Sequence, residues 1–134
     1  MGSVVYYVDF ENVHFEGIRG IEELDEEDLV LIYCREDDVN RIKNHIGKTK
    51  ASVRCRIVSG VSKNALDFEL ITDLFMSKKE GLKFIISKDK GFDAAINEGK
   101  RNNVLCFRKT SIKGSRFETF LEFYGEKSKE YVLC

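Results

Sequence analysis

The chain has 134 residues, a net charge of −1 and a charged fraction of 34%. Its length fits a single domain, 1–134, and its balanced charge argues against a passive nucleic-acid coat protein, which would be strongly basic. The sequence contains no apolar run of about 18 residues and no basic leader, so we expect neither a membrane span nor a signal peptide.

Four widely spaced cysteines form no CxxC pair. Three of them lie in apolar runs, where a free cysteine behaves as a small hydrophobic residue. This usage disfavours a disulfide framework or a zinc site and indicates a reducing, cytoplasmic location.

Short apolar runs alternate with segments of helical spacing along the whole chain. In chain order we expect a strand at 4–8, a short acidic helix within 20–28, a strand at 29–34, a helix at 37–47, an edge strand at 53–58, a helix at 64–77, a strand at 84–86, a helix at 91–101, a strand at 104–107 and a helix at 115–124. Alternation of this kind is typical of βαβ units around a parallel sheet. Right-handed crossovers then predict an α/β fold, a three-layer doubly wound sandwich with a central, mainly parallel five-stranded sheet of the Rossmann-like type.

Acidic and polar residues follow the ends of two predicted strands. Asp9 ends the first strand and is followed by Glu11 and Asn12, while Ser87 and Asp89 follow the fourth. In parallel α/β sheets, ligands bind beyond the carboxyl ends of the strands. We therefore expect these side chains to share one site, although an Asp at a strand end is also a common helix cap or turn residue.

Further acids lie on predicted helices. Asp67 heads the apolar stripe of the helix at 64–77, where an unpaired carboxylate would be costly to bury. Asp73 lies two turns later and is less well aligned, and Asp93 opens the helix at 91–101. Converging carboxylates repel one another unless a hard cation neutralises them, and oxygen ligands suit Mg²⁺ or Mn²⁺ rather than zinc. Such a metal can polarise a phosphodiester and activate water.

A phosphate backbone would also require basic residues near these acids. The candidates are Lys63, Lys88, Arg108, Lys109, Lys113 and Arg116. The last four surround the end of the fifth strand, and we expect them at the same edge of the sheet as the acids. A solvated surface is the alternative for each. The aromatic residues of the segment 115–124 have helical spacing and form either core or a docking face that would support a homodimer.

Three motifs resemble those of the PIN-like domain superfamily, and of its NYN branch in particular. They are VDFENV at 8–13, KNALDFELITDLF at 63–75 and IISKDKGFDAAI at 85–96, and they occur in the family's order. The resemblance implies the strand order 3-2-1-4-5 and a metal-dependent endoribonuclease that hydrolyses RNA. It also implies that Asp9, Asp67 and Asp89 bind Mg²⁺ or Mn²⁺, that Asn12 orders the site, that Ser87 lines it, and that Glu11 and Asp73 support it.

One position departs from the family pattern, because Gly91 stands where a second acid is common two residues after the first. Either Asp93 would substitute for it as a catalytic residue from the next helical turn, or the site would hold one metal fewer. The alternative is a PIN-like module without catalysis that binds RNA or a protein partner, and the sequence names no such partner or antitoxin. A haloacid-dehalogenase-type phosphatase is disfavoured because Glu11 stands where its second aspartate is needed, and a receiver domain because Ser59 and Gly60 follow the third strand where it needs an aspartate. A nucleotide-cofactor enzyme is disfavoured because no Gly-rich phosphate loop follows the first strand.

Overall fold

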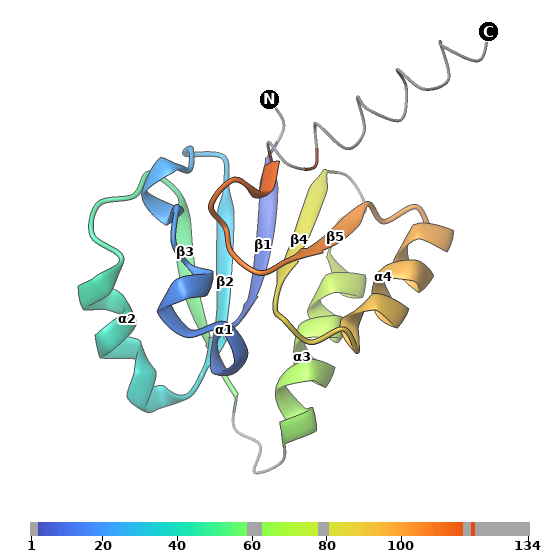
Figure 1. Cartoon of the computed structure of the whole chain (residues 1–134), viewed down its shortest axis with the longest axis horizontal. Helices are drawn as coiled ribbons and strands as arrows, with labels where there is room; N and C mark the ends of the chain where they lie inside the picture. Colours follow the sequence, from blue (N-terminus) through green and yellow to red (C-terminus); the bar gives the residue numbers. More distant parts are fainter. Residues whose placement is uncertain (1–2, 59–62, 78–80, 117–118, 120–134) are drawn as a thin grey trace, which may run out of the picture.

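The computed structural model describes residues 3–58, 63–77, 81–116 and 119. Its centre is a five-stranded sheet in the order β3-β2-β1-β4-β5, with every neighbouring pair parallel (Figure 1). The strands are β1 (Val4–Asp9), β2 (Leu29–Cys34), β3 (Ser52–Ile57), β4 (Leu82–Ile86) and β5 (Cys106–Lys109). The helices are α1 (Phe10–Gly17), α2 (Val39–His45), α3 (Lys63–Met76) and α4 (Phe92–Arg101), with short 3-10 helices η1 (Ile21–Glu23) and η2 (Glu36–Asp38). The predicted α/β fold and strand order are confirmed.

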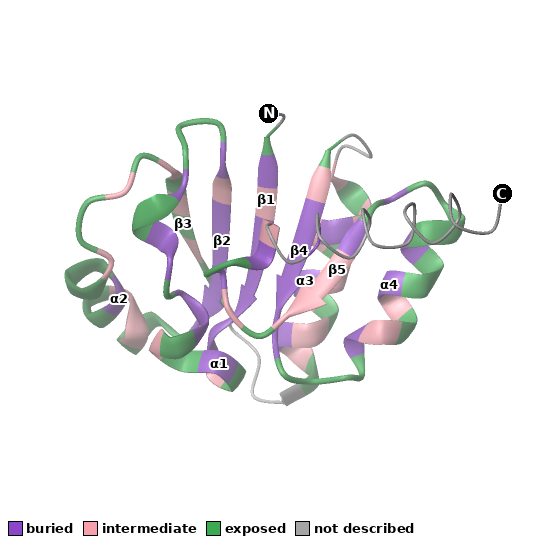
Figure 2. Ribbon diagram, turned by 45° about the horizontal axis from the view of Figure 1, so that its top comes forward, coloured by how far each residue is buried: buried purple, intermediate pink, exposed green. Residues whose placement is uncertain are grey.

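Helices cover both faces of the sheet, with α1 and α2 on one face and α3 and α4 on the other (Figure 1). Each face carries its own hydrophobic core, the first under α1 and α2 and the second under α3 and α4. In β1, Tyr6 and Val8 belong to the first core, whereas Tyr7 belongs to the second. Because both faces of β1 are buried, its sequence is a continuous apolar run rather than an alternating one. Figure 2 shows the same distribution, with burial concentrated on the central strands and exposure on the outer surfaces of the helices.

The apolar stripe of α3 explains how this helix docks on the sheet. Leu66, Leu70 and Leu74 recur every four residues and are buried in the second core. That spacing places them on one face of a helix. Phe68 and Met76 lie off the stripe and are 76% and 82% exposed. Within the described part of the chain, no helix combines the length and apolar content needed to cross a membrane.

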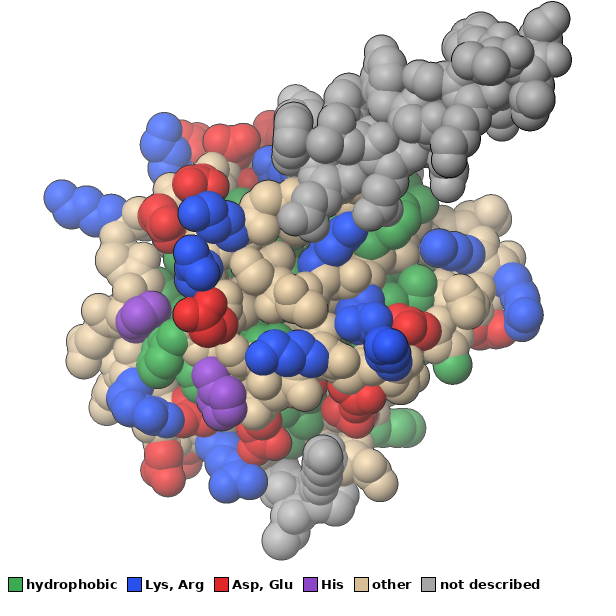
Figure 3. All heavy atoms as spheres, viewed as in Figure 1, with side chains coloured by type: hydrophobic (Ala, Val, Ile, Leu, Met, Phe, Trp, Pro, Cys, Tyr) green, Lys and Arg blue, Asp and Glu red, His purple; other side chains and the backbone are tan. Residues whose placement is uncertain are grey.

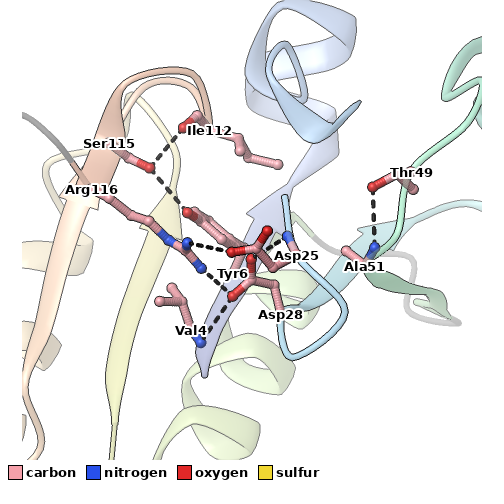
Figure 4. A network of polar contacts seen from close by, with 9 residues as sticks. All are labelled: Val4, Tyr6, Asp25, Asp28, Thr49, Ala51, Ile112, Ser115 and Arg116. Carbon is pink, nitrogen blue, oxygen red and sulfur yellow. Dashed lines mark hydrogen bonds and ion pairs between the residues drawn. The ribbon is translucent and has the colours of Figure 1, made fainter. Parts of the chain in front are cut away.

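After β5, the chain returns across the face that carries α1. The backbone N–H of Ile112 donates to the Gly17 carbonyl at 2.9 Å. Farther on, Arg116 forms an ion pair with Asp28, whose carboxylate also accepts the Val4 backbone N–H at the start of β1 (Figure 4). This return therefore ends at the amino edge of the sheet, opposite the predicted site.

The structure tests the helix predicted within 20–28 but not most of the helix predicted at 115–124. The acidic segment 20–28 forms only the three-residue η1, which is shorter than predicted. The segment predicted as a helix at 115–124 lies mostly outside the described residues, as does its aromatic cluster.

Candidate active site

Asp9 lies at the carboxyl edge of the sheet, where it ends β1 and is 5% exposed. The neighbouring strand β4 ends at Ile86, which pairs with Val8, so the next residue, Ser87, comes to lie beside Asp9. The Ser87 hydroxyl donates to Asp9 Oδ2 at 3.0 Å and is itself fully buried. The parallel register of β1 and β4 thus joins two predicted site residues that are far apart in the sequence.

The turn between β4 and α4 is held by hydrogen bonds to its backbone N–H groups. Asn12 Oδ1 accepts from the N–H of Lys88 at 2.7 Å, and Ser87 Oγ accepts from the N–H of Asp89 at 3.1 Å. Asp89 Oδ1 in turn accepts from the N–H of Gly91 at 2.8 Å. Asn12 therefore orders this turn from α1, and the turn presents Ser87 to Asp9.

The carboxyl group of Asp9 is electrostatically strained. Burial is the main cause that raises its pKa from 3.8 to about 6, and the Ser87 hydrogen bond opposes that rise. The charges of Asp67, on α3, and of Glu11, on α1, raise the pKa of Asp9 further. Asp67 is therefore close enough to Asp9 for the two carboxylates to repel each other, which a shared cation would relieve.

These residues fit a Mg²⁺ ion that keeps several water ligands better than an ion held entirely by protein ligands. Mg²⁺ in proteins typically keeps several waters and is held by one or two carboxylates together with substrate phosphates. Asp9 and Asp67 supply such a pair. Among the residues that the structure describes, no group of three or more His, Cys, Asp or Glu side chains is arranged to hold a metal. Asp89 is exposed, and its carboxylate is turned back to the Gly91 N–H.

A family model described as a PIN domain matches residues 3–108. The chain belongs to the PIN domain family. Domains of this family are typically nucleases and usually need divalent metals. No curated protein and no solved structure matches the chain.

Three other acids named from the sequence accept hydrogen bonds from side chains in this PIN domain. Asp93 Oδ1 accepts from Arg108 Nε at 2.8 Å, so its carboxylate forms an ion pair, and the catalytic role of Asp93 stays a prediction. Glu11 accepts from Arg35 at 2.6 Å. Asp73 accepts from the Tyr33 hydroxyl at 2.6 Å on the α3 side of the sheet.

The predicted basic residues separate into different places. Lys88 is exposed on the turn beside Asp9. Arg108 Nη1 donates to the Ser87 carbonyl at 3.2 Å. Lys109 ends β5, and Lys63 opens α3, although its side chain lies outside what the structure describes. Figure 3, which views the face that carries α1 and α2, shows lysine and arginine side chains spread over that face with acidic side chains among them.

The expectation that all four basic residues after β5 gather at the acidic edge is wrong for Arg116. Its guanidinium pairs with Asp28 and lies 3.8 Å from Asp25 at the amino edge of the sheet (Figure 4). Lys113 is also displaced, since its backbone packs against Gly20 on the return over α1. The cause is the return of the chain after β5, which carries these residues away from the strand end.

Neither Arg35 nor His14 was singled out from the sequence. Arg35 directly follows β2 at the same edge as Asp9 and pairs with Glu11, so the strand-end rule applied to β2 would have found it. His14 has a φ of 52° and a ψ of −149° inside α1. That conformation is strained for a residue with a side chain, and no sequence pattern signals it.

Proposed function

We propose that this PIN domain is a metal-dependent endoribonuclease of the NYN type that hydrolyses RNA phosphodiester bonds with Mg²⁺ or Mn²⁺. The observation that supports it most is the buried Asp9 carboxyl, whose pKa is raised by burial and by the neighbouring Asp67. The carboxylates of Asp9, at the end of β1, and Asp67, in α3, repel each other, which opposes ionisation of Asp9. A cation-dependent site gives this arrangement a purpose.

In this proposal Asp9 and Asp67 hold the cation. When bound, a divalent ion polarises the phosphodiester and lowers the pKa of a bound water. Ser87 fixes the orientation of the Asp9 carboxylate through its 3.0 Å hydrogen bond. Asn12 fixes the turn that carries Ser87, and the exposed Lys88 side chain is placed to meet a substrate phosphate.

A second candidate is a PIN module that binds RNA or a protein without cleaving it. The Asp89 carboxylate supports this reading, because it accepts the Gly91 N–H of its own turn and forms no three-acid metal group with Asp9 and Asp67 among the described residues. The two candidates differ in one respect that can be measured, namely whether cleavage requires both metal and Asp9.

The test is cleavage of end-labelled single-stranded RNA with Mn²⁺, Mg²⁺ or EDTA. Wild type and Asp9→Asn are purified identically, and Glu22→Gln, at an exposed carboxylate of η1, serves as the control. The nuclease proposal expects metal-dependent cleavage by wild type and the control and none by Asp9→Asn. If wild type cleaves no RNA with any metal while it remains folded, the binding module replaces the nuclease.

A further inference from the structure

A surface pocket of about 410 Å³ lies between α4 and β5, beside the candidate active site. Its wall carries three cations, Lys100, Arg108 and Lys109, and one acid, Asp93. The pocket therefore has an excess of positive charge, although the protein as a whole has a net charge of −1. None of the steps assigned to Asp9, Asp67 and Ser87 uses this pocket.

Arg108 connects the pocket to the active site. Its Nε donates to Asp93 Oδ1 at 2.8 Å on the pocket wall, and its Nη1 donates to the Ser87 carbonyl at 3.2 Å. Ser87 in turn holds Asp9. The Arg108 side chain is only 19% exposed, so the guanidinium is fixed between these two partners. Ser87 thus connects the pocket wall to Asp9.

Lys100 is also placed by a specific contact. Its Nζ lies 5.4 Å from the centroid of the Phe107 ring, within the range of a cation–π interaction. The Phe107 ring in turn packs against Phe84 of the core, with 6.3 Å between centroids. An ammonium that rests on a ring anchored to the core is better ordered than an ordinary surface lysine, and it remains exposed to solvent at this site.

We infer that this pocket, the β5 pocket (Lys100, Phe107, Arg108, Lys109), binds a nucleotide of single-stranded RNA next to the scissile phosphate. The inference rests on the proposed function. A concave wall with excess positive charge and an aromatic ring suits the phosphate and base of an unpaired nucleotide. The phosphates of a duplex lie on a convex surface and do not enter a pocket of about 410 Å³. The nuclease would accordingly prefer single strands.

The experiment measures binding in EDTA, where cleavage is blocked, by fluorescence anisotropy. The probes are a short fluorescein-labelled single-stranded RNA and the duplex formed with its complement. The proteins are wild type, Lys100→Gln, Lys109→Gln and the double variant. Lys43→Gln is the matched control, because Lys43 is an exposed lysine of α2 on the opposite face of the sheet.

We expect the double variant to bind single-stranded RNA roughly tenfold more weakly than wild type at low salt. Each pocket variant should also reduce the slope of log K against log salt by about 1, the loss of one phosphate contact. Lys43→Gln should match wild type. The duplex should bind more weakly than the single strand.

Different failures have different meanings. If the pocket variants bind like Lys43→Gln while wild type still cleaves RNA in an Asp9-dependent way, the β5 pocket is overturned and the proposed function stands. If the duplex binds wild type as tightly as the single strand does, and the pocket variants weaken the binding of both RNAs equally, the single-strand assignment is overturned. If wild type neither binds nor cleaves RNA, the proposed function fails, and the inference fails with it.

Discussion

Replacing Asp9 with Asn should stabilise the metal-free protein at neutral pH, although it removes the residue proposed to hold the metal. Asp9 is 5% exposed, and its ionisation is opposed by burial and by the charges of Asp67 and Glu11. Asn retains a side-chain oxygen that can accept the Ser87 hydroxyl but carries no charge. The variant therefore removes the cost of burying a charge and keeps the hydrogen bond from the Ser87 hydroxyl.

The size of the effect follows from the pKa of Asp9, which is raised from 3.8 to about 6. Because one pKa unit corresponds to about 1.4 kcal/mol, the ionised carboxylate lowers the free energy of unfolding by about 3 kcal/mol. Below about pH 4 the group is protonated in both states and has little effect on stability. Between about pH 4 and 6 the unfolded chain ionises first, so the stability of wild type falls until the folded protein ionises as well.

Urea denaturation in EDTA across this pH range measures the difference. Wild type and Asp9→Asn should be about equally stable near pH 4, and the variant should be more stable by up to about 3 kcal/mol at neutral pH. Adding Mn²⁺ should stabilise wild type and leave the variant unchanged, since a ligand stabilises the state that binds it. Glu22→Gln should behave as wild type in both respects. If Asp9→Asn is less stable than wild type at neutral pH in EDTA, the fold stabilises the charged carboxylate and the reasoning is refuted.

Three further substitutions test other parts of the molecule. Ser87→Ala removes the hydrogen bond that favours ionised Asp9, so the pKa of Asp9 should rise further; the pH–rate profile should shift upward and cleavage should fall roughly tenfold. Arg116→Met leaves the buried Asp28 unpaired and should cost about 3 kcal/mol in urea denaturation without changing the dependence of cleavage on metal; an unchanged midpoint would contradict this. Gly91→Asp restores the acid common in the family at a right-handed helical backbone position, so Mn²⁺-dependent cleavage should increase, and an equal or lower rate from a folded variant would contradict the role given to Gly91.

The sequence predicted the strands and the helices α2, α3 and α4 because local patterns determine them. It did not predict α1 (Phe10–Gly17), a short helix interrupted by the non-helical backbone of His14. The central strands are buried on both faces and therefore read as apolar runs, and the leucines of α3 repeat every four residues because only one face of the helix meets the sheet. The strand order came from the family resemblance. The positions of Asp9 and Ser87 at one edge then follow from parallel pairing, which places the carboxyl ends of β1 and β4 side by side.

Side-chain direction and the route of the chain after β5 were not predictable in the same way. Arg116 reaches the amino edge because it pairs with Asp28, which is 88 residues away in the sequence. Asp93 pairs with Arg108 because β5 places the Arg108 guanidinium 2.8 Å from the Asp93 carboxylate. Both outcomes depend on a partner that is brought near only by the finished sheet, so no local pattern reports them.

The orientation of Asp89 links these observations to the choice between nuclease and binding module. Its carboxylate accepts one backbone N–H, at Gly91, and the residue is exposed. A hydrogen bond of this kind contributes only about 1 kcal/mol net, because water replaces it when it breaks. Burial and the charges of Asp67 and Glu11 together raise the pKa of Asp9 from 3.8 to about 6, which corresponds to about 3 kcal/mol, so a cation that neutralises Asp9 offsets more than the cost of releasing Asp89 from its turn. We therefore expect metal and substrate to displace this contact, so that Asp89 joins Asp9 and Asp67 as the third acid of the site when the cation binds.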